Sequence, residues 1–156
     1  DMQPLLGEPL KTREDIEKDP VQVAPVLDAL QNNNREFYRS LFLHLVYNVN
    51  KPDEKRFEEY IDDMLTQRNL VDIDFALTRF NITDENNGVV DGTNEYEKVL
   101  CPVDIIHGDK DLVVPLEESI FTSKLLKNTK LTVLKDSGHN PMIDKLDEVV
   151  DSSSKR

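Results

Sequence analysis

The last third of the chain alternates strand and helix patterns, and this alternation limits the fold more than any other feature. Apolar, strand-like residues run over 103–107 and again over 130–135, and a helical pattern covers 116–127 between them. A long connection that contains a helix joins parallel strands, whereas antiparallel neighbours can be joined by a short turn. The sequence therefore predicts a βαβ unit, a further helix over about 142–152, and the α/β fold class.

Helical patterns dominate the residues before this unit. Apolar side chains at spacings of three and four predict amphipathic helices over 35–48, 52–67 and 71–80. Shorter helices are predicted after Thr12, which would form a capping box with Asp15, and beyond Pro25. The prolines and the glycine in residues 1–9 indicate irregular chain. Residues 81–94 are rich in Asn, Asp, Gly and Thr, and this composition indicates a loop. We thus divide the chain into a helical segment, 1–94, and an α/β segment, 95–156.

The predicted parallel sheet is too small to stand by itself. Parallel strands are normally covered on both faces and have several neighbours. We therefore expect further strands from outside these 156 residues.

The charge balance restricts the partners of the protein. Its 19 basic and 31 acidic residues give a formal net charge of −12, and no Lys/Arg-rich face or Gly-rich phosphate loop is visible. Nucleic acid and anionic membranes are therefore poor partners. No apolar run is long enough to span a bilayer, and no signal-peptide pattern is present. The single Cys101 excludes an intrachain disulfide and a multi-cysteine metal site, so we expect a cytoplasmic protein without metal or cofactor.

Polar motifs follow both predicted strands. The first contains Asp109 and Asp111, and the second contains Gly138 and His139, 28 residues after Asp111. Ligands bind at the carboxyl ends of strands in open α/β sheets, and adjacent parallel strands would bring the two motifs together. A buried carboxylate that accepts the His Nδ1 proton fixes the tautomer of the imidazole and stabilises its protonated form. A calcium loop is excluded, because its other ligands and its glycine are missing.

These motifs resemble the C-terminal part of the α/β-hydrolase family. The family shows a proline, an apolar strand, His-Gly-x-x-Asp-x-x-x-Pro, a helix, and a strand that leads into Gly-His. The matching residues are Pro102, Val103, Ile105, Ile106, His107, Gly108, Asp111, Pro115, Leu131, Val133, Leu134, Gly138 and His139. The resemblance implies a triad in the order Ser, acid, His, with Asp111 as the acid and His139 as the base. His107 is then more often structural than catalytic.

The nucleophile of this family has no counterpart in the sequence. It lies in Gly-x-Ser-x-Gly, and no two of the five glycines bracket a serine at that spacing. We expect it, with the oxyanion hole, in the missing N-terminal part of the same fold.

The resemblance also implies that the helical segment is a cap, or lid, over the active site. Side chains on its apolar stripes are candidates for contact with a small-molecule substrate, namely Phe37, Phe42, His44, Phe57 and Tyr60. The alternative is that these side chains form the core of the cap itself, or, for His44, that it occupies a partly exposed helix position.

The leading hypothesis is a fragment of a serine hydrolase. The full protein would hydrolyse a small ester or related acyl substrate, and the chain by itself would be inactive. One alternative is an Asp nucleophile, as in relatives that open epoxides or displace halide. Another is a non-catalytic, hydrolase-like ligand-binding protein that retains Asp111 and His139. The discriminating position lies outside the sequence.

Overall fold

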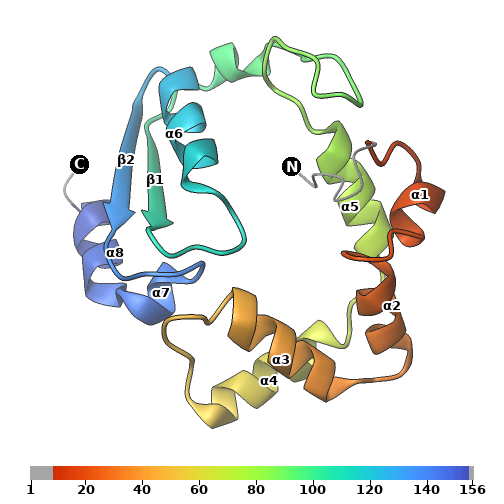
Figure 1. Cartoon of the computed structure of the whole chain (residues 1–156). Helices are drawn as coiled ribbons and strands as arrows, with labels where there is room; N and C mark the ends of the chain where they lie inside the picture. Colours follow the sequence, from red (N-terminus) through yellow and green to blue (C-terminus); the bar gives the residue numbers. More distant parts are fainter. Residues whose placement is uncertain (1–8, 155–156) are drawn as a thin grey trace. The chain divides into compact units, whose positions relative to one another are not determined.

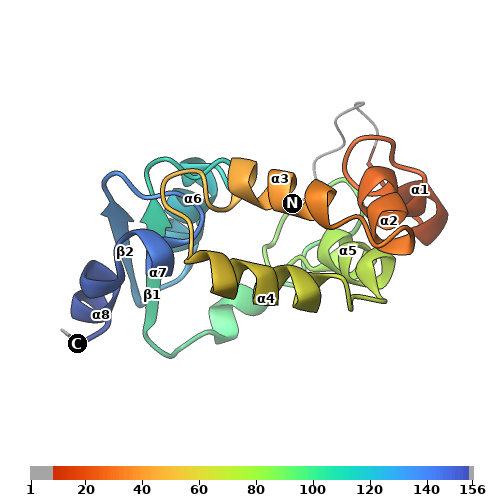
Figure 2. The same ribbon diagram turned by 90° about the horizontal axis from the view of Figure 1, so that it is seen from below.

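The computed structural model describes residues 9–154 (Figures 1 and 2). The chain divides into two compact units. Unit 1 comprises Asp1–Arg35 and Asp62–Tyr96, and unit 2 comprises Glu36–Ile61 and Glu97–Arg156. Residues 36–61 thus pack with the α/β segment, while the cap role of residues 1–94 stays a prediction. The irregular chain predicted for residues 1–9 lies outside the described residues, apart from Pro9.

Unit 1 contains the short helices that the sequence predicted. α1 (Arg13–Glu17) begins with the expected capping box: Thr12 Oγ1 accepts from the Asp15 N–H at 3.1 Å, and Asp15 Oδ2 accepts from the Thr12 N–H at 3.0 Å. α2 (Ala24–Gln31) and α5 (Leu70–Arg79) follow, and α1 packs against α5. An ion pair of 2.6 Å between Arg13 and Asp72 joins α1 to α5. The buried apolar side chains of these helices and their connections include Ile16, Val23 and Ala29.

The predicted loop over residues 81–94 is confirmed and is organised by one buried side chain. Asn81 donates to the backbone oxygen of Glu85 at 2.7 Å and accepts from the Thr83 hydroxyl at 2.7 Å. Its own carbonyl accepts from the Thr93 N–H at 3.1 Å. The loop leads into a short 3₁₀ helix, η1 (Glu95–Lys98).

Unit 2 contains the predicted βαβ unit, which is confirmed. β1 (Val103–Gly108) and β2 (Thr129–Leu134) run parallel, and α6 (Leu116–Leu125) connects them and packs against both. In the register, Val103 lies opposite Thr129 and Gly108 lies opposite Leu134. The two strands therefore end at the same edge of the sheet, as the arrowheads in Figure 1 show.

The C-terminal helix is interrupted, which the sequence did not predict. Instead of one helix over 142–152, the chain forms α7 (Pro141–Asp144) and α8 (Leu146–Ser154). Lys145 separates them with φ −146° and ψ 46°, outside the helical region. After this break, α8 lies beside β2, where the Thr132 and Ser152 hydroxyls are 3.2 Å apart.

The remaining helices are α3 (Arg35–Leu45) and α4 (Glu54–Met64), joined by residues 46–53, which we name the α3–α4 connector. Both helices are shorter than their predicted ranges. Arg39 on α3 pairs with Glu54 at 2.7 Å and also with Glu58. Residues of unit 2 with little exposed area form its aromatic and aliphatic core, namely Tyr38, Tyr47, Phe57, Ile61 and Leu134.

A second set of apolar side chains in unit 2 is exposed. Val133 on β2 is 44% exposed and Phe121 on α6 is 51% exposed, although parallel sheets are normally covered on both faces. Other members of this set are Leu100, Leu112, Val113, Met142, Leu146 and Val150. None of the helices within residues 9–154 combines the length and the apolar character needed to cross a membrane.

Candidate active site

Two loops leave the common edge of β1 and β2. The acid loop, residues 109–115, follows β1, and the base loop, residues 135–140, follows β2. A backbone hydrogen bond joins them, because the Lys110 N–H donates to the Ser137 oxygen at 2.8 Å. The Asp109 N–H donates to the oxygen of Leu134, at the end of β2, at 3.0 Å. Main-chain hydrogen bonds thus contribute to the relative position of the two loops.

Gly108 allows the two loops to approach this closely. A Cβ atom at Gly108 would lie 2.3 Å from the Gly138 oxygen and 2.4 Å from the Ser137 oxygen. Real Cβ atoms do not approach backbone oxygens to such distances, so any larger residue would push the base loop away from the end of β1. The glycine at the end of β1 is therefore required by packing and not by its own dihedral angles.

The predicted acid and base meet at this edge. His139 Nδ1 lies 3.0 Å from Asp111 Oδ2 and 3.2 Å from Asp111 Oδ1. The Asp111 side chain is 7% exposed, whereas that of His139 is 35% exposed. Because Nδ1 faces the carboxylate, the Nε2 atom is the ring nitrogen left to exchange a proton with another group.

The surroundings of Asp111 keep its carboxylate ionised. Its Oδ1 atom accepts from the backbone N–H groups of Val113 at 2.7 Å and of Val114 at 3.0 Å. Burial acts to raise the pKa of Asp111, but the hydrogen bonds from Val114, His139 and Val113 outweigh burial. The pKa of Asp111 consequently lies below its ordinary value.

We expect the carboxylate of Asp111 to titrate at a lower pH than that of Asp74, a half-buried residue on α5. Burial raises the pKa of Asp74, whereas hydrogen bonds lower that of Asp111. Carboxyl ¹³C NMR of the aspartate-labelled protein measures both, with Asp74→Asn and Asp111→Asn assigning the signals. The reverse order of titration would contradict the hydrogen-bonded environment of Asp111.

The lowered pKa also sets the sign of a stability effect. The contribution of ionised Asp111 to the free energy of unfolding is complete above the ordinary aspartate pKa, about 4. It is lost as the pH falls through the lower pKa of the folded protein.

The other predicted or nearby polar residues have structural contacts. His107 is buried, and its Nδ1 atom lies 2.8 Å from the Ser119 hydroxyl, which connects β1 to α6. Ser137 in the base loop is completely buried, and its hydroxyl lies 3.4 Å from Asp144. Neither arrangement exposes a nucleophile.

The candidate substrate-contacting residues are distributed over α3 and α4. Phe57 is completely buried, with its ring edge-on to Tyr47 at a centroid distance of 5.4 Å, so the structure places it in the core of unit 2. Phe37 and Phe42 are half-buried, and each contacts the ring of Tyr38. His44 is exposed and Tyr60 is half-buried. A substrate role for these side chains stays a prediction.

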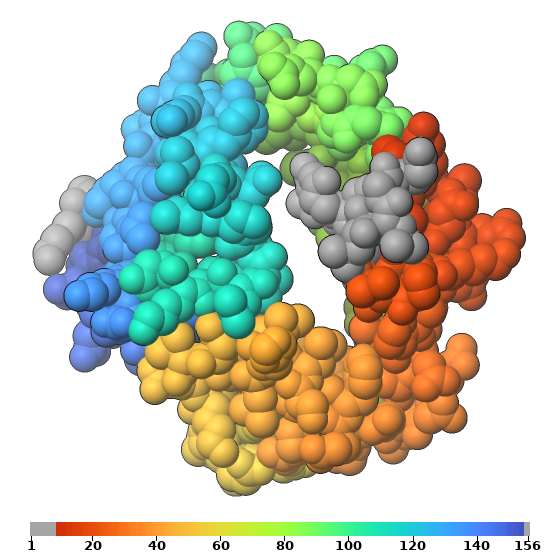
Figure 3. Space-filling view, viewed as in Figure 1, coloured from red at the N-terminus to blue at the C-terminus, as the bar shows by residue number. Residues whose placement is uncertain are grey.

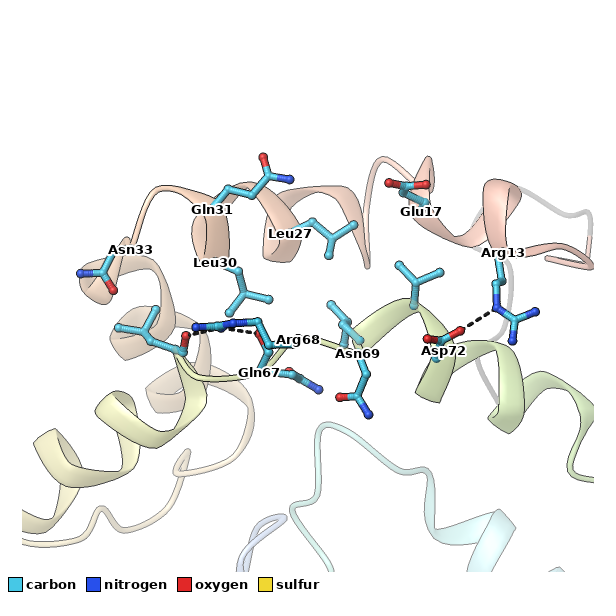
Figure 4. A pocket seen from close by; sticks show the side chains of 13 residues that line it. Arg13, Glu17, Leu27, Leu30, Gln31, Asn33, Gln67, Arg68, Asn69 and Asp72 are labelled. Atoms are coloured by element: carbon cyan, nitrogen blue, oxygen red, sulfur yellow. Dashed lines mark hydrogen bonds and ion pairs between the residues drawn. The ribbon is translucent and has the colours of Figure 1, made fainter.

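A separate pocket lies within unit 1, between α1 and α2 on one side and residues 65–72 on the other (Figure 4). It has a volume of about 720 Å³ and contains none of the predicted site residues. Its two guanidinium groups already have partners. Arg13 pairs with Asp72, and Arg68 Nη1 donates to the backbone oxygens of Leu65 and Gln67.

Sequence reasoning missed Asp144, which contacts the base loop, and Asn48, which contacts the acid loop. Asp144 Oδ2 accepts from the Gly138 N–H at 2.7 Å, and Asn48 Nδ2 donates to the Lys110 oxygen at 2.8 Å. Asp144 was visible only as one of several acidic residues near the start of the predicted C-terminal helix. Among residues 9–154, no group of three or more His, Cys, Asp and Glu side chains is arranged to hold a metal ion.

Comparison with known proteins identifies the family. Residues 12–146 match the model of the alpha/beta hydrolase fold family. This match covers well over half of the chain, and the chain therefore belongs to the alpha/beta hydrolase family.

Two relatives illustrate the similarity. Lipase 1 of Psychrobacter immobilis is 29% identical over 68 residues, which cover 41% of this chain and 22% of the lipase. The solved structure of 2-hydroxy-6-oxo-6-phenylhexa-2,4-dienoate hydrolase (BphD) from Rhodococcus sp. strain RHA1 has a TM-score of 0.57 and 21% identity. That likeness concerns the fold, and it covers 96% of this chain and 51% of the hydrolase. The chain thus spans about half of the solved hydrolase and about a fifth of the lipase.

Proposed function

We propose that this chain supplies the acid and the base of a Ser-Asp-His triad, and that the complete protein hydrolyses a small ester or related acyl substrate. The observation that carries the proposal is the 3.0 Å contact between His139 Nδ1 and the buried carboxylate of Asp111. Both residues lie on loops that leave the same edge of a parallel sheet, where open α/β sheets bind their ligands. The serine would come from the rest of the fold.

The roles of the two residues follow from their orientation. The serine Oγ would attack the acyl carbon while His139 Nε2 takes its proton, and Asp111 would stabilise the resulting imidazolium. The imidazolium then returns the proton to the leaving alcohol, which leaves an acyl-enzyme. A water molecule, deprotonated by the same nitrogen, attacks the acyl-enzyme, and the imidazolium returns this proton to the serine Oγ as the acid is released.

Two further observations support the proposal. Membership of the alpha/beta hydrolase family and the hydrolase names of both relatives point to hydrolysis. The exposed apolar side chains on β2, α6 and α8 are a surface that the remaining strands and helices of such a fold would cover.

The test uses the complete protein, in which the chain is joined to the rest of the fold. We expect a fluorophosphonate probe to label one serine and to abolish hydrolysis of short p-nitrophenyl esters, because the probe reacts with a serine activated by a base. Absence of labelling together with turnover of an epoxide or a haloalkane would indicate an Asp nucleophile instead. Absence of labelling and of any turnover, with retained ligand binding, would indicate a binding protein.

A further inference from the structure

The α3–α4 connector contacts the acid loop directly. Asn48 Nδ2 donates to the backbone oxygen of Lys110 at 2.8 Å, and Lys110 immediately precedes Asp111. The connector and the acid loop are 62 residues apart in sequence at this contact. In Figure 3 the yellow-orange surface of this part of the chain lies against the teal surface that includes the acid loop.

The connector also reaches the base loop, through the carboxylate of Asp144 on α7. Asp144 Oδ1 accepts from the Asn50 N–H at 2.9 Å, and Asp144 Oδ2 accepts from the Gly138 N–H at 2.7 Å. Gly138 immediately precedes His139.

The Asn48 side chain also faces the base loop. Its Oδ1 atom is buried and has no hydrogen-bond partner among the described residues. This atom faces Gly138, where an added Cβ would lie 2.0 Å from it. The Asn48 side chain thus packs against the base loop through its oxygen and is hydrogen-bonded to the acid loop through its amide nitrogen.

We propose that the connector is a clamp that sets the distance between Asp111 and His139, with Asn48 and Asp144 as its positioning residues. The inference rests on the proposed triad function, because a clamp matters only if the pair performs chemistry. Neither positioning residue touches the reacting atoms. Each acts through the residue that precedes the acid or the base, so the clamp makes the geometry of the pair depend on the placement of α3 and α4.

The isosteric variant Asp144→Asn tests the base side of the clamp in the complete protein. The N–H groups of Asn50 and Gly138 donate to different oxygens of Asp144, so an asparagine would present its NH₂ group, which cannot accept, to one of them. We expect kcat for p-nitrophenyl esters to fall by on the order of 10²-fold, the effect of misplacing a catalytic group by about 1 Å. KM should stay within about twofold, because the substrate contacts are not altered.

The variant Asn48→Ala tests the acid side in the same assay, with an expected loss in kcat of on the order of 10-fold to 10²-fold. The double variant should lose less than the product of the two single losses, because both changes disturb the same Asp111–His139 contact. Asp147→Asn and Lys55→Ala are the controls. Both residues are exposed, and both lie outside the connector but close in sequence to the positioning residues, so their replacement should leave kcat unchanged.

A spectroscopic measurement separates positioning from general stability. The imidazole ¹⁵N signals of His139 report which ring nitrogen carries the proton, and the contact with Asp111 favours the proton on Nδ1. We expect Asp144→Asn and Asn48→Ala to lower the population of this tautomer, whereas the two controls should not. If Asp144→Asn fails to fold, Asp144→Glu, which keeps both acceptor oxygens, should retain the tautomer and at least part of kcat.

The outcomes distinguish failure of the clamp from failure of the proposed function. Wild-type kcat and wild-type tautomer populations in both Asn48→Ala and Asp144→Asn would overturn the clamp, provided that Asp111→Asn and His139→Ala abolish turnover. Equal losses in the controls would overturn it as well. If Asp111→Asn and His139→Ala leave turnover intact, the triad function fails, and the tautomer measurement still decides whether the connector positions the pair.

Discussion

Replacing Asp111 by Asn is expected to lower kcat of the complete hydrolase by about 10⁴-fold, and His139→Ala by at least as much. Two backbone N–H groups, of Val113 and Val114, donate to Asp111 Oδ1 and would hold the oxygen of an asparagine in the same place. The amide nitrogen would then occupy the position of Oδ2, which faces His139 Nδ1. A donor at that position forces the proton of the neutral imidazole onto Nε2, where it blocks acceptance of the serine proton.

The neighbouring carboxylate provides the matched control. Asp109 is exposed and contacts the base loop through a 3.3 Å hydrogen bond from the Ser137 N–H. Asp109→Asn makes the same change in charge two positions away, and we expect it to change kcat by less than about tenfold, because the proposed acid stays in place. Steady-state kinetics on a chromogenic ester, with thermal unfolding of each variant, measures the difference. A loss in Asp109→Asn as large as that in Asp111→Asn would contradict the assignment of the acid.

The variant Gly108→Ala is expected to reduce the free energy of unfolding by about 3 kcal/mol or more, at the upper end of overpacking effects. The two nearest atoms that the new Cβ would meet, at 2.3 and 2.4 Å, are both backbone oxygens of the base loop. No change of side-chain rotamer can relieve these contacts, so the base loop must move away from β1. Because His139 is carried by that loop, kcat should fall together with stability.

Differential scanning calorimetry and ester hydrolysis together test this prediction. The control is Gly88→Ala in unit 1, where the added Cβ would meet only Pro9 at 3.6 Å but φ is +90°. Its cost comes from the backbone conformation and should be about 1–2 kcal/mol. We expect Gly88→Ala to lower Tm without changing kcat. A Gly108→Ala protein with wild-type Tm and kcat would show that the two loops do not pack as described.

The parts of the fold that the sequence predicted are those with short-range signals. Thr12 and Asp15 lie three residues apart and cap one helix, and the period of apolar residues separates β1, α6 and β2. Asp111 and His139 could be paired because parallel strands necessarily bring their carboxyl ends to one edge. These predictions needed local chemistry and a rule of topology, and the choice of Asp111 over Asp109 came from the family resemblance, in which the acid lies three residues after the glycine.

The features that escaped prediction depend on contacts between distant residues. Asn48 meets Lys110 across 62 residues, and Asn50 meets Asp144 across 94. In sequence, Asp144 does not differ from the exposed Asp147, since both lie in a predicted acidic helix start. The sequence also left undecided whether Phe57 contacts a substrate or lies in the protein core. An apolar stripe on a helix indicates that a side chain is buried, but not which residues it packs against.

The hydrogen bonds that fix the two loops mostly use main-chain atoms of the loops themselves, such as the oxygen of Lys110 and the N–H of Gly138. The side chains of Lys110 and Asp136 form an ion pair, but both are 53% exposed, and such pairs contribute little. Side-chain identity at Lys110 is thus little constrained by this pair, whereas Asp136 has a φ of 55°, a left-handed conformation that favours Asp, Asn or Gly. A mutant library that varies the rim of the candidate active site can therefore change Lys110 freely, but should restrict position 136 to these three residues.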